Sequence, residues 1–142
     1  MRKLVLSLVV VCALALTAAS LAGTRGSGWS AKLTAAQEIP RQVVSTPAAS
    51  GVFTATLSGN TLKWKLSFSK LSGPALAAHI HFGATGKYGN VLVTLCSPCK
   101  NGASGSAALT AAVKKDFSKH LLYVNVHTGK NLSGEIRGQL GG

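Results

Sequence analysis

Residues 53–68, FTATLSGNTLKWKLSF, alternate apolar and polar side chains on both sides of the pair Gly59-Asn60. Alternation with a period of two is typical of a β-strand that has one buried and one exposed face. A Gly-Asn pair between two such runs predicts a tight hairpin turn. The stretch therefore predicts two antiparallel strands, and Trp64 falls on their apolar face.

The same alternation continues through most of the chain after residue 28. It predicts further strands, separated by turns that contain Gly, Pro or Asn, over residues 29–34, 78–82, 91–95, 104–110, 121–128 and 134–140. Residues 37–49 read as a loop, and residues 111–119 as one helical turn or an irregular crossover. Short strands at this spacing predict a single all-β domain, an antiparallel β-sandwich or barrel of Greek-key type.

Residues 1–22 have the pattern of a secretory signal peptide, with a basic start, an apolar run and a small-residue end. The apolar run is too short to favour a stable membrane span. We therefore expect a protein that is secreted, periplasmic or at the cell surface, with no transmembrane span after the leader is cleaved. The expected parts are the signal peptide over 1–22, a linker over 23–28 and the domain over 29–142.

The chain is strongly basic, with 15 Lys and Arg against three Asp and Glu and a formal net charge of +12. No basic run is longer than two residues, so the charge is spread over the surface rather than gathered in a tail. Such a surface attracts anionic polymers, and in an exported protein the expected partner is an anionic surface polymer or another extracellular macromolecule rather than nucleic acid. General solubility is the alternative explanation of the charge.

Two cysteines remain if Cys12 is removed with the leader, namely Cys96 and Cys99, spaced C-S-P-C. An oxidising compartment favours a disulfide between them. A metal-binding thiol pair and a thioredoxin-like redox centre are the alternatives. Neither has its usual setting, because there is no second C-x-x-C and the motif is followed by a turn rather than a helix.

Polar side chains concentrate on the strands expected over residues 78–82, 121–128 and 134–140. Side chains two apart on a strand share a face, and the hairpin between the last two strands makes their polar rows neighbours. If the first of these strands lies beside them, the rows merge into one patch made of His79, His81, Tyr123, Asn125, His127, Glu135, Arg137 and Gln139.

This patch has three interpretations. Three imidazoles close together suit Cu²⁺ or Zn²⁺, with Glu135 as a candidate fourth ligand. Alternatively, Tyr123, Asn125, Glu135 and Arg137 form a structural polar network in which Glu135 and Arg137 are an ion pair. The third interpretation is a recognition surface for a partner.

The same motifs resemble those of the CHRD domain, a family first described in chordin and common in secreted bacterial proteins. AHIH, YVNVHT and GEIRGQL occur here in the family's order, at residues 78–81, 123–128 and 134–140, and the likeness covers about residues 29–140. The resemblance implies an exported domain of β-sandwich or barrel type that interacts with other macromolecules. It implies no defined enzymatic activity.

The sequence offers few candidate catalytic groups, because the chain lacks a Gly-x-Ser-x-Gly motif, a phosphate loop and paired carboxylates. HIHFG at residues 79–83 resembles the copper strand of copper/zinc superoxide dismutase, but the zinc-binding motifs of that enzyme are missing. The resulting expectation is an exported, non-catalytic binding or structural module. The alternative is a copper- or zinc-binding protein, with redox activity if copper is bound, that uses His79, His81 and His127.

Overall fold

The computed structural model describes residues 27–142, so the expected signal peptide and most of the expected linker lie outside the described residues. Within this part of the chain, a short 3-10 helix, η1, spans Ala35–Gln37, and one α-helix, α1, spans Ala111–Ser118. The strands are β1 Ser27–Thr34, β2 Ser50–Ser58, β3 Thr61–Ser69, β4 Ala75–Phe82, β5 Val91–Cys96, β6 Ala103–Ala108, β7 Leu122–Thr128 and β8 Ile136–Gln139.

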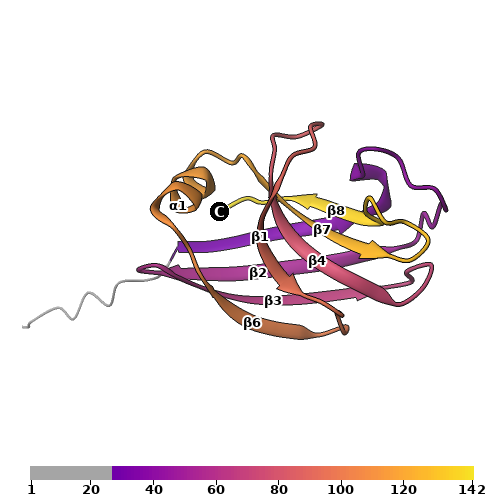
Figure 1. Ribbon diagram of the computed structural model, residues 1–142, viewed down its shortest axis with the longest axis horizontal. Helices are drawn as coiled ribbons and strands as arrows, with labels where there is room; N and C mark the ends of the chain where they lie inside the picture. The colour runs from indigo at the N-terminus through magenta and orange to yellow at the C-terminus, as the bar shows by residue number, and fades with distance from the viewer. Residues whose placement is uncertain (1–26) are drawn as a thin grey trace, which may run out of the picture.

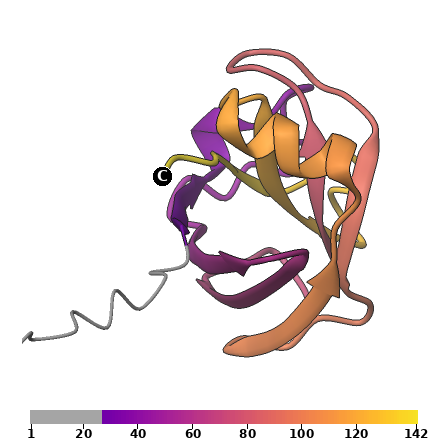
Figure 2. The ribbon, with the colours of Figure 1, turned by 90° about the vertical axis from the view of Figure 1, so that its left-hand side faces the viewer.

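These strands form one antiparallel sheet with the order β5-β4-β7-β8-β1-β2-β3-β6 (Figure 1). The sheet curls until its two end strands, β5 and β6, contact each other, which gives a nearly closed barrel (Figure 2). Near closure protects the backbone groups that an open sheet leaves unpaired at its edges. The predicted all-β, antiparallel, single-domain fold is confirmed, with a single curled sheet.

The hairpin predicted from residues 53–68 is the β2–β3 pair. Its register runs from Ser50 opposite Ser69 to Ser58 opposite Thr61, so two residues form the turn. The first of them, Gly59, has a φ of 59°, a left-handed conformation that glycine adopts at little cost.

Apolar side chains from seven of the strands, β1 to β5, β7 and β8, fill the barrel. The most deeply buried, each at most 1% exposed, are Leu33, Phe53, Leu62, Leu66, Ala78, Ile80, Leu122, Val124, Val126 and Ile136. The interior is therefore a packed core. The polar side chains that alternate with these residues lie on the outer face of the barrel.

Helix α1 lies over part of one end of the barrel (Figures 1 and 2). It is longer than the single turn or irregular crossover that the sequence predicted. Thr110 caps its start by accepting a hydrogen bond from the Val113 amide through its side chain. Phe117 is buried and packs edge-on against Trp29, with 5.2 Å between ring centroids. Among the described residues, no helix is both long and apolar enough to cross a bilayer.

We predict that Phe117→Ala lowers the free energy of unfolding by about 3 kcal/mol, because it removes a buried ring from the contact between α1 and the barrel. Urea unfolding followed by circular dichroism measures the change. Lys115→Ala, an exposed change in the same helix, is the matched control and should stay within about 0.5 kcal/mol of the wild type. Equal effects of the two changes would contradict the packing role of Phe117.

Candidate metal centre

Three of the chain's four histidines meet on the outer face of β4 and β7. The register places Ala77 opposite His127 and His79 opposite Asn125, so His79 and His127 are diagonal neighbours. The ring centroids lie 4.9 Å apart for His79 and His127, 5.5 Å for His79 and His81, and 5.8 Å for His81 and His127. The structure thus pairs β4 with β7, which was the condition for the three histidines to share one patch.

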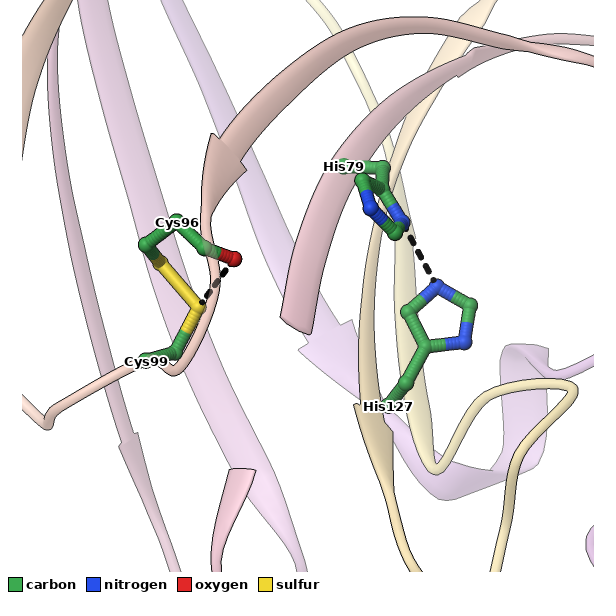
Figure 3. Close-up of a disulfide and its surroundings, with 4 residues drawn as sticks. All are labelled: His79, Cys96, Cys99 and His127. Atoms are coloured by element: carbon green, nitrogen blue, oxygen red, sulfur yellow. Dashed lines mark hydrogen bonds between the residues drawn. A yellow bond between two sulfur atoms is a disulfide. The ribbon is translucent and has the colours of Figure 1, made fainter. Parts of the chain in front are cut away.

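The ring nitrogens are close enough for one ion. His79 Nδ1 and His127 Nε2 lie 3.1 Å apart (Figure 3), and one nitrogen from each of the three rings lies within 4.8 Å of the others. Two nitrogens bound to one metal at about 2.05 Å are about 3.3 Å apart in tetrahedral geometry and about 4.1 Å apart at most. The closest pair lies just below this range, and the widest pair must close by at least about 0.7 Å, or by about 1.5 Å for tetrahedral geometry.

Backbone carbonyls orient two of these rings. His81 Nδ1 lies 3.0 Å from the Gly89 carbonyl oxygen, and His127 Nδ1 lies 2.9 Å from that of Leu132. Because a carbonyl only accepts, the proton of each neutral ring sits on Nδ1 and leaves Nε2 as an acceptor. His127 Nε2 accepts the hydrogen bond that His79 Nδ1 donates, so a metal bound to His79 Nδ1 would require that ring's proton to move to its Nε2. A hydrogen bond of this kind on the far nitrogen is the usual support of a metal-binding histidine.

Burial keeps the three rings uncharged near neutral pH. It lowers the pKa of His79 to about 4, with the neighbouring His127 and His81 rings adding to the effect. It also lowers the pKa values of His81 and His127, although their hydrogen bonds to the backbone oppose the change. The neutral imidazole is the form that binds a metal, so the cluster is in its binding form without deprotonation.

Tyr123 and Arg137 continue the cluster along the outer face. The Tyr123 ring stacks on His81, with centroids 4.9 Å apart and planes 10° from parallel. The Arg137 guanidinium carbon lies 3.5 Å from the Tyr123 ring centroid, which is a cation–π contact. The stack of these three side chains fixes the position of the His81 ring.

The loop after β4 closes over this stack. Gly89 donates its amide hydrogen to the Tyr123 hydroxyl, and Arg137 donates to the carbonyl oxygens of Ala84 and Lys87. A Cβ on Gly89 would lie 1.9 Å from the Phe82 carbonyl oxygen, so only glycine permits this approach. The loop is therefore held to the sheet by the same residues that position His81.

Glu135 does not join the histidines, contrary to the expectation from alternation. Its amide donates to the Val126 carbonyl, while Ile136 pairs with Val126, so two consecutive residues oppose one, as in a β-bulge. The bulge turns the Glu135 side chain toward Thr128, on the opposite face of β7 from His127. The structure therefore gives no support to Glu135 as a fourth ligand.

The Glu135 carboxylate has its own set of donors, Thr46, Ser72, Thr128 and Asn131, and the expected ion-pair partner Arg137 is not among them. Burial alone would raise the pKa of Glu135. The hydrogen bonds from Ser72, Thr128 and Thr46 outweigh burial and lower that pKa to about 2. Glu135 thus ties the β7–β8 turn to two distant loops as a charged, satisfied group.

Glu38 is the site residue that sequence reasoning missed. It follows η1, is 3% exposed, and accepts a hydrogen bond of 3.1 Å from Asn125 Nδ2. Burial raises its pKa to about 8, although the Asn125 bond and the Arg137 charge oppose the change. A Cβ on Gly134 would lie 2.4 Å from Asn125 and 2.7 Å from Glu38, so glycine is needed there. The signals in the sequence were that Glu38 is one of three acids and that it lies in QEIP, residues 37–40, a stretch included in the resemblance to the CHRD domain.

Cys96 and Cys99 form a disulfide in the turn between β5 and β6, on the strand next to His79 (Figure 3). In this form neither sulfur is a thiolate, so the two residues offer no metal ligand. In the part of the chain that the structure describes, the ligand atoms grouped around His79 are therefore imidazole nitrogens only. This arrangement agrees with the first of the three interpretations of the C-S-P-C motif.

Comparison with known proteins identifies one family. A family model described as the CHRD domain matches residues 29–140, which is nearly the whole of the described chain. No curated protein and no solved structure matches the chain. The match spans both strands that carry the histidine cluster and the loop that carries Glu38.

We predict that the wild type loses stability relative to Glu38→Gln as the pH rises from 5 to 9. A carboxyl group whose folded pKa of about 8 exceeds its ordinary value of 4.5 stabilises the fold fully below pH 4.5. That contribution disappears as the pH rises through the folded pKa, whereas glutamine stays neutral. Between pH 5 and 9, the free energy of unfolding of the wild type should fall by on the order of 3 kcal/mol relative to that of Glu38→Gln, as measured by urea unfolding.

Glu135→Gln is the matched control with the opposite sign. Its folded pKa of about 2 lies below the ordinary 4.5, so its contribution is present above pH 4.5 and lost as the pH falls toward 2. Identical pH profiles of the wild type and Glu38→Gln between pH 5 and 9 would show that Glu38 is not held in its protonated form.

Proposed function

The chain belongs to the CHRD domain family, and from this premise we propose that it is a binding module whose ligand is a transition-metal ion held by His79, His81 and His127. One observation carries the proposal. His81 Nε2 is buried without a hydrogen-bond partner among the described atoms, and it belongs to the cluster whose ligand nitrogens lie within 4.8 Å of one another. A buried polar atom left unpaired costs about 1–3 kcal/mol, and a bound cation would remove that cost.

The donor set favours copper(II) or zinc(II). Its donors are three imidazole nitrogens, which suit both ions, and at equal availability Cu²⁺ binds nitrogen sites more tightly than Zn²⁺. Three protein ligands also leave one position for a water molecule or an external ligand. Copper in this position would supply one-electron redox chemistry. The carbonyl groups of Gly89 and Leu132 orient the rings of His81 and His127, and the stack on Tyr123 also fixes the ring of His81.

We propose binding rather than catalysis because of what surrounds the rings. Among the described residues, no carboxylate joins the three histidines. Glu135 is saturated by its donors, and Glu38 faces Asn125. The neighbours Tyr123 and Arg137 make contacts that hold the fold together. No group beside the rings is therefore placed as a general acid or base.

We also propose that the protein acts outside the cytoplasm. The leader pattern over residues 1–22 supports export. The disulfide between Cys96 and Cys99 supports the same conclusion, because such bonds persist in oxidising compartments.

Export predicts a mature protein that begins at Gly23. Expression of the full chain in its source cells, followed by fractionation and N-terminal sequencing, measures this. Recovery of the protein in the cytoplasm with Met1 or Arg2 at its start would contradict export and would leave the metal site untouched.

Metal binding predicts uptake of about one Cu²⁺ or Zn²⁺ per chain in calorimetric titration of the metal-stripped protein. His81→Ala and His127→Ala should each weaken the affinity by at least about a hundredfold, because each removes one of three ligands. His120→Ala is the matched control, since His120 is the one histidine outside the cluster, and should bind as the wild type does.

The alternative is that the three histidines belong to a structural network, and this alternative predicts different results in the same experiment. The wild type and all histidine variants would then take up metal equally weakly, while His81→Ala and His127→Ala would lower the melting temperature. That outcome would overturn the metal proposal and leave a CHRD module held together by its polar face.

A further inference from the structure

The half of the barrel formed by β2, β3 and β6 carries a second, chemically different surface. These strands lie side by side in the sheet (Figure 1). Most of their outward side chains are exposed lysines, threonines and serines, and the apolar exceptions are Val52 and Ala108. We call this surface the lysine–hydroxyl face and define it by Thr54, Thr56, Lys63, Lys65, Ser104 and Ser106.

The strand register gives this face a repeating pattern. Lys63 lies between Thr56 of β2 and Ser106 of β6, and Lys65 lies between Thr54 and Ser104. Neighbouring strands are about 4.8 Å apart, and residues two apart on a strand are separated by about 6.7 Å. Each lysine is therefore flanked on both sides by a hydroxyl group, and the unit of one cation with two hydroxyls occurs twice along the face.

No acidic side chain offsets these lysines. The chain has three Asp and Glu, and the stretch from residue 39 to residue 115 contains none. Glu38 and Glu135 are only 3% and 0% exposed, and Asp116 is half-buried on α1. The positive charge of the face is thus almost unopposed at the surface, and it attracts polyanions over the range of the screening length.

We propose that the lysine–hydroxyl face binds an acidic polysaccharide, a linear glycan whose sugars carry carboxylate, sulfate or phosphate groups. The lysines pair with the anionic groups, and the flanking hydroxyls exchange hydrogen bonds with the hydroxyls of the sugars. Thr54, Thr56, Lys63 and Lys65 line a shallow hollow of about 190 Å³ on this face. This assignment is independent of the histidine cluster, which lies on β4 and β7.

The composition of the face distinguishes a glycan from other polyanions. Proteins that bind single-stranded nucleic acid stack bases on exposed aromatic rings, but Trp64 points into the core and is 5% exposed. Membrane-surface elements present several apolar side chains beside their lysines, whereas the residues directly opposite Lys63 and Lys65 all carry hydroxyls and Val52 is the one large apolar side chain exposed on these three strands. The pattern of cations and hydroxyls is the complement of a charged sugar chain.

Binding of the full chain to immobilised dextran sulfate tests the proposal, with neutral dextran as the baseline. The double variant K63Q/K65Q should bind about tenfold more weakly at physiological ionic strength, because two paired charges are lost. The matched control K119Q/K130Q removes the same charge from exposed residues outside the face and should change the affinity by less than about twofold. Thermal unfolding of both variants verifies that they fold as the wild type does.

Three results would overturn the proposal. Absence of wild-type binding to dextran sulfate is the first. Equal weakening by K63Q/K65Q and K119Q/K130Q is the second, because it would show that only the net charge matters. The third is binding to single-stranded DNA or to vesicles of phosphatidylglycerol that is tighter than binding to dextran sulfate and equally dependent on Lys63 and Lys65.

Discussion

The antiparallel register between β4 and β7 is the constraint on which the candidate site depends. It sets Ala77 opposite His127 and His81 opposite Tyr123, and it makes His79 the diagonal neighbour of His127. A slip of one residue would turn the whole polar row of a strand toward the other face. Such a slip is costly because Ile80, Val124 and Val126, which alternate with the polar residues, are fully buried. Packing of the core therefore positions the imidazoles outside it.

Two buried carboxylates show how the surroundings decide the charge of the same group. Glu135 accepts hydrogen bonds from several hydroxyl, amide and backbone donors, which more than offset its desolvation. Glu38 has one side-chain donor, Asn125, and its Oε1 has no partner among the described atoms, so desolvation dominates. The fold thus keeps one acid charged and the other protonated near neutrality. Neither carboxylate is free to neutralise the lysines of the surface.

Alternation in the sequence was enough to predict the strands, the β2–β3 hairpin and the pairing of His79 with His81 on one face, because all of these follow from a period of two within regular strands. The approach of these two histidines to His127 was conditional on β4 lying beside β7, and the pairing of those strands meets that condition. Glu135 departed from the prediction because the bulge opposite Val126 interrupts that period. Glu38 was missed because its burial comes from a loop that folds back on Asn125, a contact over 87 residues that no local pattern encodes. Long-range pairing and local irregularity are thus the information that periodicity lacks.

The histidine cluster and the lysine–hydroxyl face are proposed to bind ligands of opposite charge, a cation and a polyanion, on one strongly basic molecule. A formal net charge of +12 repels a divalent cation and attracts a polyanion. Screening limits both effects to about 8 Å at physiological ionic strength, so neither reaches across the barrel at full strength. At short range the three imidazole rings are neutral, so they would add no positive charge around an ion held there, and the carbonyl partners of His81 and His127 would strengthen those rings as donors. Affinity for a cation must therefore come from coordination alone, while affinity for an anion comes from the exposed lysines of β3.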